Sequence, residues 1–211
     1  MNSTFDQTEL LRVKYARNVA NGRASLLGVI LATVVSMASL ALADIYFVFS
    51  AYLPFSFFTD GWYGWQIANG TYPYMNELAA EDIAYYTELG TFGLVFGIVM
   101  ALIGVLGYFI CWALSKKHPA ALLIGTVFFG IDCALLALNT VLTMDFSMII
   151  DIVFHAVLMY TMVQAVISGS KLKKLPAPIE GEAVAVDPAA ETIAIPAEET
   201  APASSDNTPE V

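Results

Sequence analysis

Charged residues and cysteines are scarce in this sequence. Asp, Glu, Lys and Arg make up 13% of the 211 residues and hydrophobic residues 58%, which leaves too few polar side chains to cover a soluble globule of this size. The two cysteines, Cys111 and Cys133, lie apart in apolar runs and support neither a disulfide framework nor a Cys-x-x-Cys metal site. The composition argues against a soluble globular protein.

Motifs of common chemistries are absent as well. The sequence has no Walker loop, no dinucleotide-binding fingerprint, no His-Glu-x-x-His and no Gly-x-Ser-x-Gly. Lys and Arg number 9 against 19 acids and form no basic patch, so nucleic acid is not expected as a partner. The lack of these motifs argues against an enzyme but does not exclude one.

Four apolar stretches are long enough to cross a membrane as helices, which takes about 20 residues each. Because the hydrocarbon core contains no water, every backbone polar group in it must be paired within the protein, as in a helix or a closed barrel. The continuous apolar runs of this chain do not resemble the alternating strands of a membrane barrel. The sequence therefore predicts an all-α, polytopic membrane protein with four transmembrane helices: Ala24 to Phe49, Thr91 to Leu114, Ala120 to Leu142 and Met148 to Ile167.

The bases predict the orientation of these helices, because Lys and Arg are retained on the cytoplasmic side. In a four-helix topology all of these bases lie on the same side of the membrane, so both termini are expected to be cytoplasmic. They are Arg12, Lys14, Arg17, Arg23, Lys116, Lys117, Lys171, Lys173 and Lys174. A competing interpretation is a leader peptide cleaved after the motif Ala41-Leu42-Ala43, which would leave three spans.

The two cytoplasmic ends differ in character. Residues 1–23 allow a short amphipathic helix on an anionic inner leaflet, or serve only as a positive flank that sets the topology. Residues 175–211 contain six prolines, eight acids, no base and no aromatic residue, a composition that cannot bury enough surface to fold. We expect a disordered acidic tail that is either a solvated spacer or a docking segment for a cytoplasmic partner.

The extracytoplasmic loop, residues 50–90, holds eleven aromatic residues, five acids and no base. Aromatic rings are favoured at the membrane interface, where they can pack on lipid and on helix ends. The rings at the centre of the loop either cap the helix bundle or form a recognition surface for a partner. These recognition candidates are Trp62, Tyr63 and Trp65.

Turn signals divide this loop. Pro54 is expected to end or bend the first span, and Asp60-Gly61 and Asn69-Gly70 are typical of turns. The segment from Asn76 to Leu89 suits a short interfacial helix.

Polar residues inside the predicted spans are candidates for a function, since a charge in hydrocarbon is costly unless it faces protein, water or a partner. Asp132 lies near the middle of the third span, and His155 lies at a similar depth in the fourth. Asp151 lies one turn from His155 on the same helical face. Asn139 and Asp44 reach the level of Asp151 nearer the outer ends of their helices.

This Asp/His cluster admits several interpretations. Asp132 and His155 could form a hydrogen-bonded pair that fixes the third helix against the fourth. The cluster could instead handle protons or ions, because histidine titrates near neutrality. It could also hold a divalent metal through Asp132, Asp151 and His155. No other cofactor is indicated.

Small residues at four-residue spacing mark packing faces, because helices in lipid associate where their backbones approach closely. A single bundle, a homo-oligomer and a complex with another membrane protein are alternatives, all within the lipid bilayer. The residues are Gly28, Ala32 and Ser36 in the first span and Gly93, Gly97, Ala101 and Gly104 in the second.

Five short segments carry a resemblance to a known family: Asp44 to Pro54, Cys111-Trp112, Ser115 to Lys117, Asp151 to His155 and Lys171 to Pro176. In these segments the chain resembles a family of uncharacterised bacterial four-helix integral membrane proteins. The resemblance covers residues 23–176 and leaves the acidic tail outside. It implies the inner (cytoplasmic) membrane of a bacterium as the location, and it brings no assigned activity and no functional residues.

We therefore expect a multi-pass protein of the bacterial plasma membrane that acts as a non-catalytic interaction or accessory subunit. The rival hypothesis is a small carrier of ions, protons or a divalent metal that uses the intramembrane Asp/His cluster.

Overall fold

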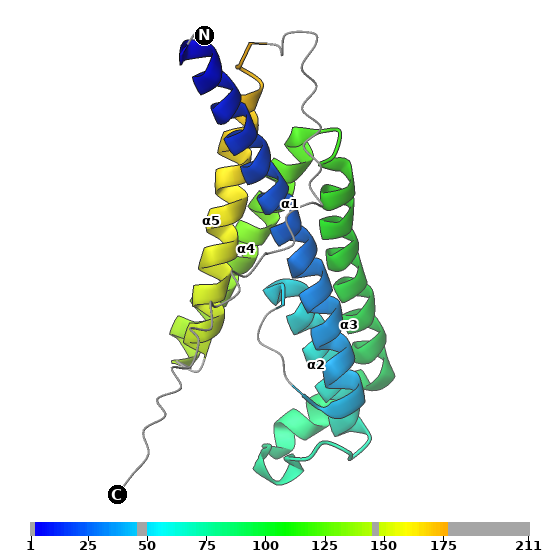
Figure 1. Cartoon of the computed structure of the whole chain (residues 1–211). Coiled ribbons are helices and arrows are strands. Elements are labelled where there is room, and N and C mark those ends of the chain that lie inside the picture. The colour runs from blue at the N-terminus through cyan, green and yellow to red at the C-terminus, as the bar shows by residue number, and fades with distance from the viewer. Residues whose placement is uncertain (1–2, 46–49, 145–147, 177–211) are drawn as a thin grey trace, which may run out of the picture. The chain divides into compact units, whose positions relative to one another are not determined.

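A computed structural model describes residues 3–45, 50–144 and 148–176, and within these ranges the chain is helical with no β-strand. The all-α class is therefore confirmed. The elements are α1 (Ser3–Ala43), α2 (Tyr52–Ala68), the short 3-10 helix η1 (Met75–Glu77), α3 (Ala80–Leu114), α4 (Pro119–Thr143) and α5 (Ile149–Leu172) (Figure 1). Nearly all of the predicted acidic tail lies outside the described residues.

Four of these helices are long and apolar enough to cross a membrane, which confirms the four predicted apolar helices. They are α1, α3, α4 and α5, with 41, 35, 25 and 24 residues. At 1.5 Å per residue, even the shortest measures roughly 36 Å and exceeds the hydrocarbon thickness of about 30 Å. Their order along the chain gives an up-and-down arrangement, in which the beginning of α1 and the end of α5 lie at the same end (Figure 1).

Helix α1 includes the segment that we treated as a separate N-terminal region, since residues 3–23 continue into the apolar part without a break. This half of α1 packs on the end of α5, where Asn18 donates a hydrogen bond to Ser168 at 2.9 Å. A Cβ atom on Gly22 would lie 2.2 Å from the Cβ of Ala165, so the helices touch through a residue without a side chain. The helix ends at Ala43, before the expected end at Phe49.

Helix α2 occupies part of the sequence that we expected to be an external loop. It begins halfway along the bundle and runs back beside α3 toward the end where α1 stops (Figure 1). The predicted turn at Asp60-Gly61 is wrong, because both residues lie inside α2. Asn69-Gly70 does follow the end of that helix, and Gly70 has a φ of +69° that suits glycine.

The glycine face of α3 packs against α2 within the same chain. A Cβ on Gly97 would lie 2.4 Å from the backbone oxygen of Phe57, and one on Gly104 would lie 2.6 Å from the ring of Pro54. Gly61 of α2 is equally close to α3, since a Cβ added to it would lie 2.9 Å from the backbone oxygen of Gly93. The small residues predicted as a packing face in the second span thus contact α2 of the same bundle, whereas Gly28 of the face predicted in the first span has no neighbour within 4 Å among the described residues.

A kink in α3 separates its first turns from its apolar part. Gly90 has a φ of +43° and a ψ of −132°, a conformation that is open to glycine and strained for other residues. The turns before the kink begin at Ala80, close to the interfacial helix that we expected from Asn76 to Leu89.

The apolar core lies where α1, α3, α4 and α5 meet. Its most buried side chains come from all four helices, and Ala51, just before α2, joins them. The core includes Leu26, Val29, Ile30, Tyr108, Leu122, Phe129, Met162 and Ala165.

The bases gather at one end of the bundle, which we call the basic end. Arg23 of α1 donates a hydrogen bond to the Ser115 hydroxyl after α3 at 2.9 Å, and the Lys171 ammonium of α5 lies 5.8 Å from the ring centre of Tyr15. The opposite end holds the last turns of α1 and α2, the start of α3, the end of α4 and the start of α5 (Figure 1). We call it the acidic end, since the chain has no Lys or Arg between Arg23 and Lys116 or between Lys117 and Lys171.

Candidate functional site

Asp132 lies buried in the middle of α4, with 3% of its surface exposed. One carboxylate oxygen accepts a hydrogen bond from the backbone N–H of Leu53 at 3.0 Å, and the other accepts one from the hydroxyl of Tyr108 on α3. Because Leu53 is the second residue of α2, the carboxylate caps the first turn of that helix, where backbone donors lack partners and negative charge is favoured.

A second buried side chain holds the start of α2 from another side. The Thr33 hydroxyl of α1 accepts a hydrogen bond from the backbone N–H of Ala51 at 2.8 Å and donates one to the Val29 carbonyl at 2.7 Å. Thr33 lies ten residues before the end of α1, roughly 15 Å along the helix. Side chains of α1, α3 and α4 therefore fix the beginning of α2 deep inside the bundle.

His155 takes its partner from its own helix. Its Nδ1 lies 2.9 Å from the backbone oxygen of Asp151 and 2.9 Å from a carboxylate oxygen of the same residue. Carbonyl and carboxylate oxygens are acceptors, so Nδ1 carries a proton, which it donates to the Asp151 main-chain oxygen. The carboxylate oxygen lies at ion-pair distance without a hydrogen bond from the described residues. The other ring nitrogen, Nε2, is buried without a hydrogen-bond partner among the described residues.

The expected bond between Asp132 and His155 is replaced by these two separate arrangements. Asp132 is occupied by donors from α2 and α3, and His155 by Asp151. Contact between α4 and α5 at this level comes from ring stacking, in which Phe129 and His155 lie 5.2 Å apart at an interplanar angle of 8°. The Cys133 thiol adds a weak contact to the His155 carbonyl at 4.0 Å.

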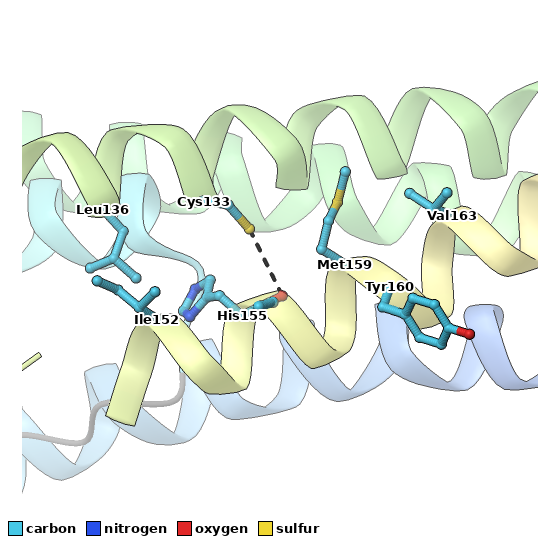
Figure 2. A pocket seen from close by; sticks show the side chains of 8 residues that line it. Cys133, Leu136, Ile152, His155, Met159, Tyr160 and Val163 are labelled. Carbon is cyan, nitrogen blue, oxygen red and sulfur yellow. Dashed lines mark hydrogen bonds between the residues drawn. The ribbon is translucent and has the colours of Figure 1, made fainter. Parts of the chain in front are cut away.

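A pocket of about 450 Å³ lies between α4 and α5 beside this histidine. Figure 2 shows its lining, with Leu136 and Ile152 near the imidazole and Tyr160 farther along α5. Apart from His155, Cys133 and Tyr160 the lining is apolar, and Tyr160 is 65% exposed on the surface of the bundle. The lining side chains are Cys133, Leu136, Ile152, His155, Ala156, Met159, Tyr160 and Val163.

The three metal candidates do not meet at one point. Asp151 and His155 lie together, whereas the two carboxylate oxygens of Asp132 face Leu53 and Tyr108. In the part of the chain that the structure describes, no three His, Cys, Asp or Glu side chains are grouped as a metal site requires. Asn139 lies elsewhere on α4, and its amide is 4.0 Å from the Met148 sulfur.

The recognition candidates belong to a cluster of rings at the acidic end, which we call the aromatic cap. Trp62 lies between Phe58, at 6.2 Å and 9°, and Trp65, at 5.5 Å and 32°. The Tyr63 ring meets a neighbouring ring edge to face. The cap consists of Phe58, Trp62, Tyr63 and Trp65 of α2 with Tyr72 and Tyr74 of the segment that follows.

Asp44 joins the aromatic cap directly after α1. Its carboxylate accepts a hydrogen bond at 3.2 Å from the side-chain amide of Gln66, a buried residue of α2. Burial raises the pKa of the Tyr63 phenol, and Tyr72, Asp44 and Tyr74 nearby raise it further. Tyr63 therefore stays neutral and keeps its hydroxyl proton.

Sequence reasoning did not single out Thr33, Tyr108 or Gln66 as site residues. Thr33 and Tyr108 lie in apolar stretches and look like ordinary residues of a span. The available signal was Pro54, the third residue of α2, because proline is common in the first turn of a helix.

Comparisons with known proteins add no assignment. The chain matches no protein-family model, no curated protein and no solved structure.

Proposed function

We propose that this chain is a multi-pass protein of the bacterial plasma membrane, with four transmembrane helices and both termini in the cytoplasm. Support comes from four long apolar helices and from bases that lie together at the basic end. The positive-inside rule places that end in the cytoplasm and the acidic end outside. The bacterial setting is what the family resemblance implies.

In this orientation α2 is a re-entrant helix, which starts at mid-membrane depth and leaves on the outer face. Its first backbone N–H groups would lack water there, and an unpaired group in hydrocarbon costs several kcal/mol. Asp132 and Thr33 supply the missing acceptors for Leu53 and Ala51. We therefore assign Asp132 a structural role.

We further propose that the protein is a non-catalytic interaction or accessory subunit that acts through the aromatic cap. The observation that supports this proposal is that the buried carboxylate of Asp132 anchors α2, the helix that carries most of the cap. A helix fixed by three neighbours presents its outer rings with little freedom, and pre-organised aromatic surfaces bind partners at low entropic cost.

A photo-crosslinking experiment in intact cells tests this role. A photoreactive phenylalanine analogue replaces Tyr74, which is 59% exposed in the cap, or as a matched control Tyr160, which is 65% exposed beside the α4 and α5 pocket. We expect one discrete protein adduct from the Tyr74 position and none from Tyr160. Lipid adducts alone at both positions would contradict the interaction role.

One observation favours the carrier as a second candidate. Within the described ranges the buried Nε2 of His155 has no partner, and the Asp151 carboxylate lies 2.9 Å from the other ring nitrogen. Such a pair is able to take up and release a proton. Proton flux into proteoliposomes that disappears in His155→Ala, with the fold retained, would support the carrier and argue against the accessory role.

A further inference from the structure

Two pairs of tyrosine rings form a corner within the aromatic cap. Tyr63 and Tyr72 lie 5.5 Å apart with 67° between their planes, and Tyr72 and Tyr74 lie 5.9 Å apart with 72° between theirs. In such edge-to-face pairs the edge of one ring lies against the face of the other, and Tyr74, which is 59% exposed, keeps most of its ring open to its surroundings. The face of an aromatic ring carries partial negative charge and attracts cations.

The carboxylate of Asp44 lies beside this corner. Gln66, one turn along α2 from Tyr63, donates its amide hydrogen bond to Asp44 at 3.2 Å, and the Asp44 charge is close enough to raise the pKa of the Tyr63 phenol. Asp44 has a φ of +50°, a left-handed conformation that Asp and Asn tolerate better than most residues. The chain thus holds this carboxylate at a defined place next to the rings.

The chain supplies no Lys or Arg to neutralise Asp44 at this end. The nearest bases in the sequence are Arg23 and Lys116, which both lie at the basic end. The Gln66 Oε1 is also buried here and has no hydrogen-bond partner in the part of the chain that is described, and Gln66 is 7% exposed. A carboxylate, an amide oxygen and the tyrosine rings of the corner therefore lie together, and the sequence places no basic side chain near them.

We propose that Asp44 and the tyrosine corner bind the ammonium headgroup of a membrane lipid of the phosphatidylethanolamine type. Ring faces and a carboxylate are the groups that recognise organic ammonium ions. A metal ion such as Ca²⁺ fits less well, since it takes six to eight oxygen ligands.

The position of Asp44 favours a lipid over a soluble molecule as the source of this ammonium. Asp44 follows the last residue of α1, at the end of an apolar span, which is the depth of lipid headgroups. The inference rests on the membrane insertion proposed above and does not depend on a protein partner of the cap.

A binding titration with the full-length protein in detergent micelles tests the site. Short-chain phosphatidylethanolamine is added, with phosphatidylglycerol as the lipid without an ammonium group. Tryptophan emission is followed because Trp62 and Trp65 belong to the same aromatic cap as the corner. We expect the wild type to bind phosphatidylethanolamine at least about tenfold more tightly than phosphatidylglycerol.

Asp44→Asn should abolish this preference and leave the fold intact. Asparagine can still accept the Gln66 hydrogen bond and tolerates the positive φ, so the substitution removes little except the charge. Asp82→Asn is the matched control, because Asp82 is an exposed carboxylate in the first turn of α3 at the same end. It should keep the wild-type preference, and Tyr63→Leu should weaken it without abolishing folding.

Two results would overturn the lipid site. One is equal affinity of the wild type for the two lipids, and the other is a preference that survives in Asp44→Asn. Asp44-dependent binding of a soluble lysine peptide, with no preference between the lipids, would also overturn it and point to a protein ligand. The crosslinks at Tyr74 report on the interaction role separately, so the two proposals can fail independently.

Discussion

The carboxylate of Asp132 in α4 accepts a hydrogen bond at 3.0 Å from the backbone N–H of Leu53 at the start of α2. The two residues are 79 positions apart in the sequence, and their bond fixes where a helix begins inside the bundle. Tyr108 of α3 donates a hydrogen bond to Asp132, and Thr33 of α1 accepts one from the backbone N–H of Ala51. Side chains of three helices therefore form the anchor that holds the start of α2. The buried polar residues in this half of the bundle thus organise the fold that carries the aromatic cap.

Removing this anchor should destabilise the protein. Asp132→Leu leaves the Leu53 N–H and the Tyr108 hydroxyl without an acceptor, and we expect a loss of about 3 kcal/mol in the free energy of unfolding. Asp132→Asn keeps one acceptor oxygen and should lose about half as much. Thermal melting in detergent measures both.

The matched control for Asp132 is Thr140→Val on the same helix. The Thr140 hydroxyl is buried and bonds the Leu136 carbonyl of its own helix, so its removal leaves α2 untouched. A melting temperature of Asp132→Leu as high as that of Thr140→Val would show that the anchor adds little stability.

The contact between α2 and α3 should tolerate no side chain at Gly97. Gly97→Ala places a carbon 2.4 Å from the Phe57 carbonyl oxygen, a backbone atom that cannot move aside alone, and overpacking of this kind typically costs about 1 to 3 kcal/mol. Gly107→Ala on the same helix meets none of the described atoms within 4 Å and should be neutral or slightly stabilising. Equal melting temperatures of these two variants would contradict the packing of α2 on α3.

The length of the apolar runs was enough to predict the four long helices from sequence. An apolar run of about 20 residues has few stable conformations in lipid other than a helix, and clustered bases mark its ends. The α2 helix was missed because its composition resembles an interfacial loop. Pro54, Asp60 and Gly61 are turn or breaker signals, which here are overridden by close packing on α3.

The candidate site was only partly predictable for a related reason. The pairing of Asp151 with His155 follows from the helical repeat, since residues four apart share a face. The partners of Asp132 depend on tertiary structure, because a backbone N–H such as that of Leu53 leaves no trace in the residue type. Asp132 was correctly singled out as an unusual buried charge, but its neighbours could not be read from spacing.

The junction of α1 and α5 gives another paired test. Gly22→Ala brings its new carbon to 2.2 Å from the Ala165 Cβ and should force the two helices apart, at a cost of about 1 to 3 kcal/mol. Gly28→Ala, six residues further along α1, would have no neighbour within 4 Å among the residues that the structure describes. We expect only the first to lower the melting temperature, and an equal fall in both would mean that contacts outside this junction, such as those between copies of the chain, decide the outcome.

Zinc should leave the stability of the protein unchanged. A ligand that binds the folded state raises the melting temperature by an amount that grows with the logarithm of its concentration over Kd, and only Asp151 and His155 of the three metal candidates lie together. Melting curves with added zinc and with chelator, together with elemental analysis, measure this. A chelator-sensitive melting temperature, lost in His155→Ala, would restore the metal hypothesis.

Replacing His155 by phenylalanine separates a structural histidine from a proton carrier. The substitution keeps a flat ring against Phe129 and removes the buried Nε2, which has no partner in the described chain and costs about 1 to 3 kcal/mol when unpaired. For a structural role we expect His155→Phe to melt lower than the wild type, because the buried Asp151 carboxylate loses its partner at 2.9 Å and this loss outweighs the relief of the unpaired Nε2. For a carrier, the same variant would fold normally and lose a proton flux that wild-type proteoliposomes show. Wild-type flux that His155→Phe abolishes would therefore place Asp151 and His155 in a transport pathway and leave the aromatic cap without the main role that we assign to it.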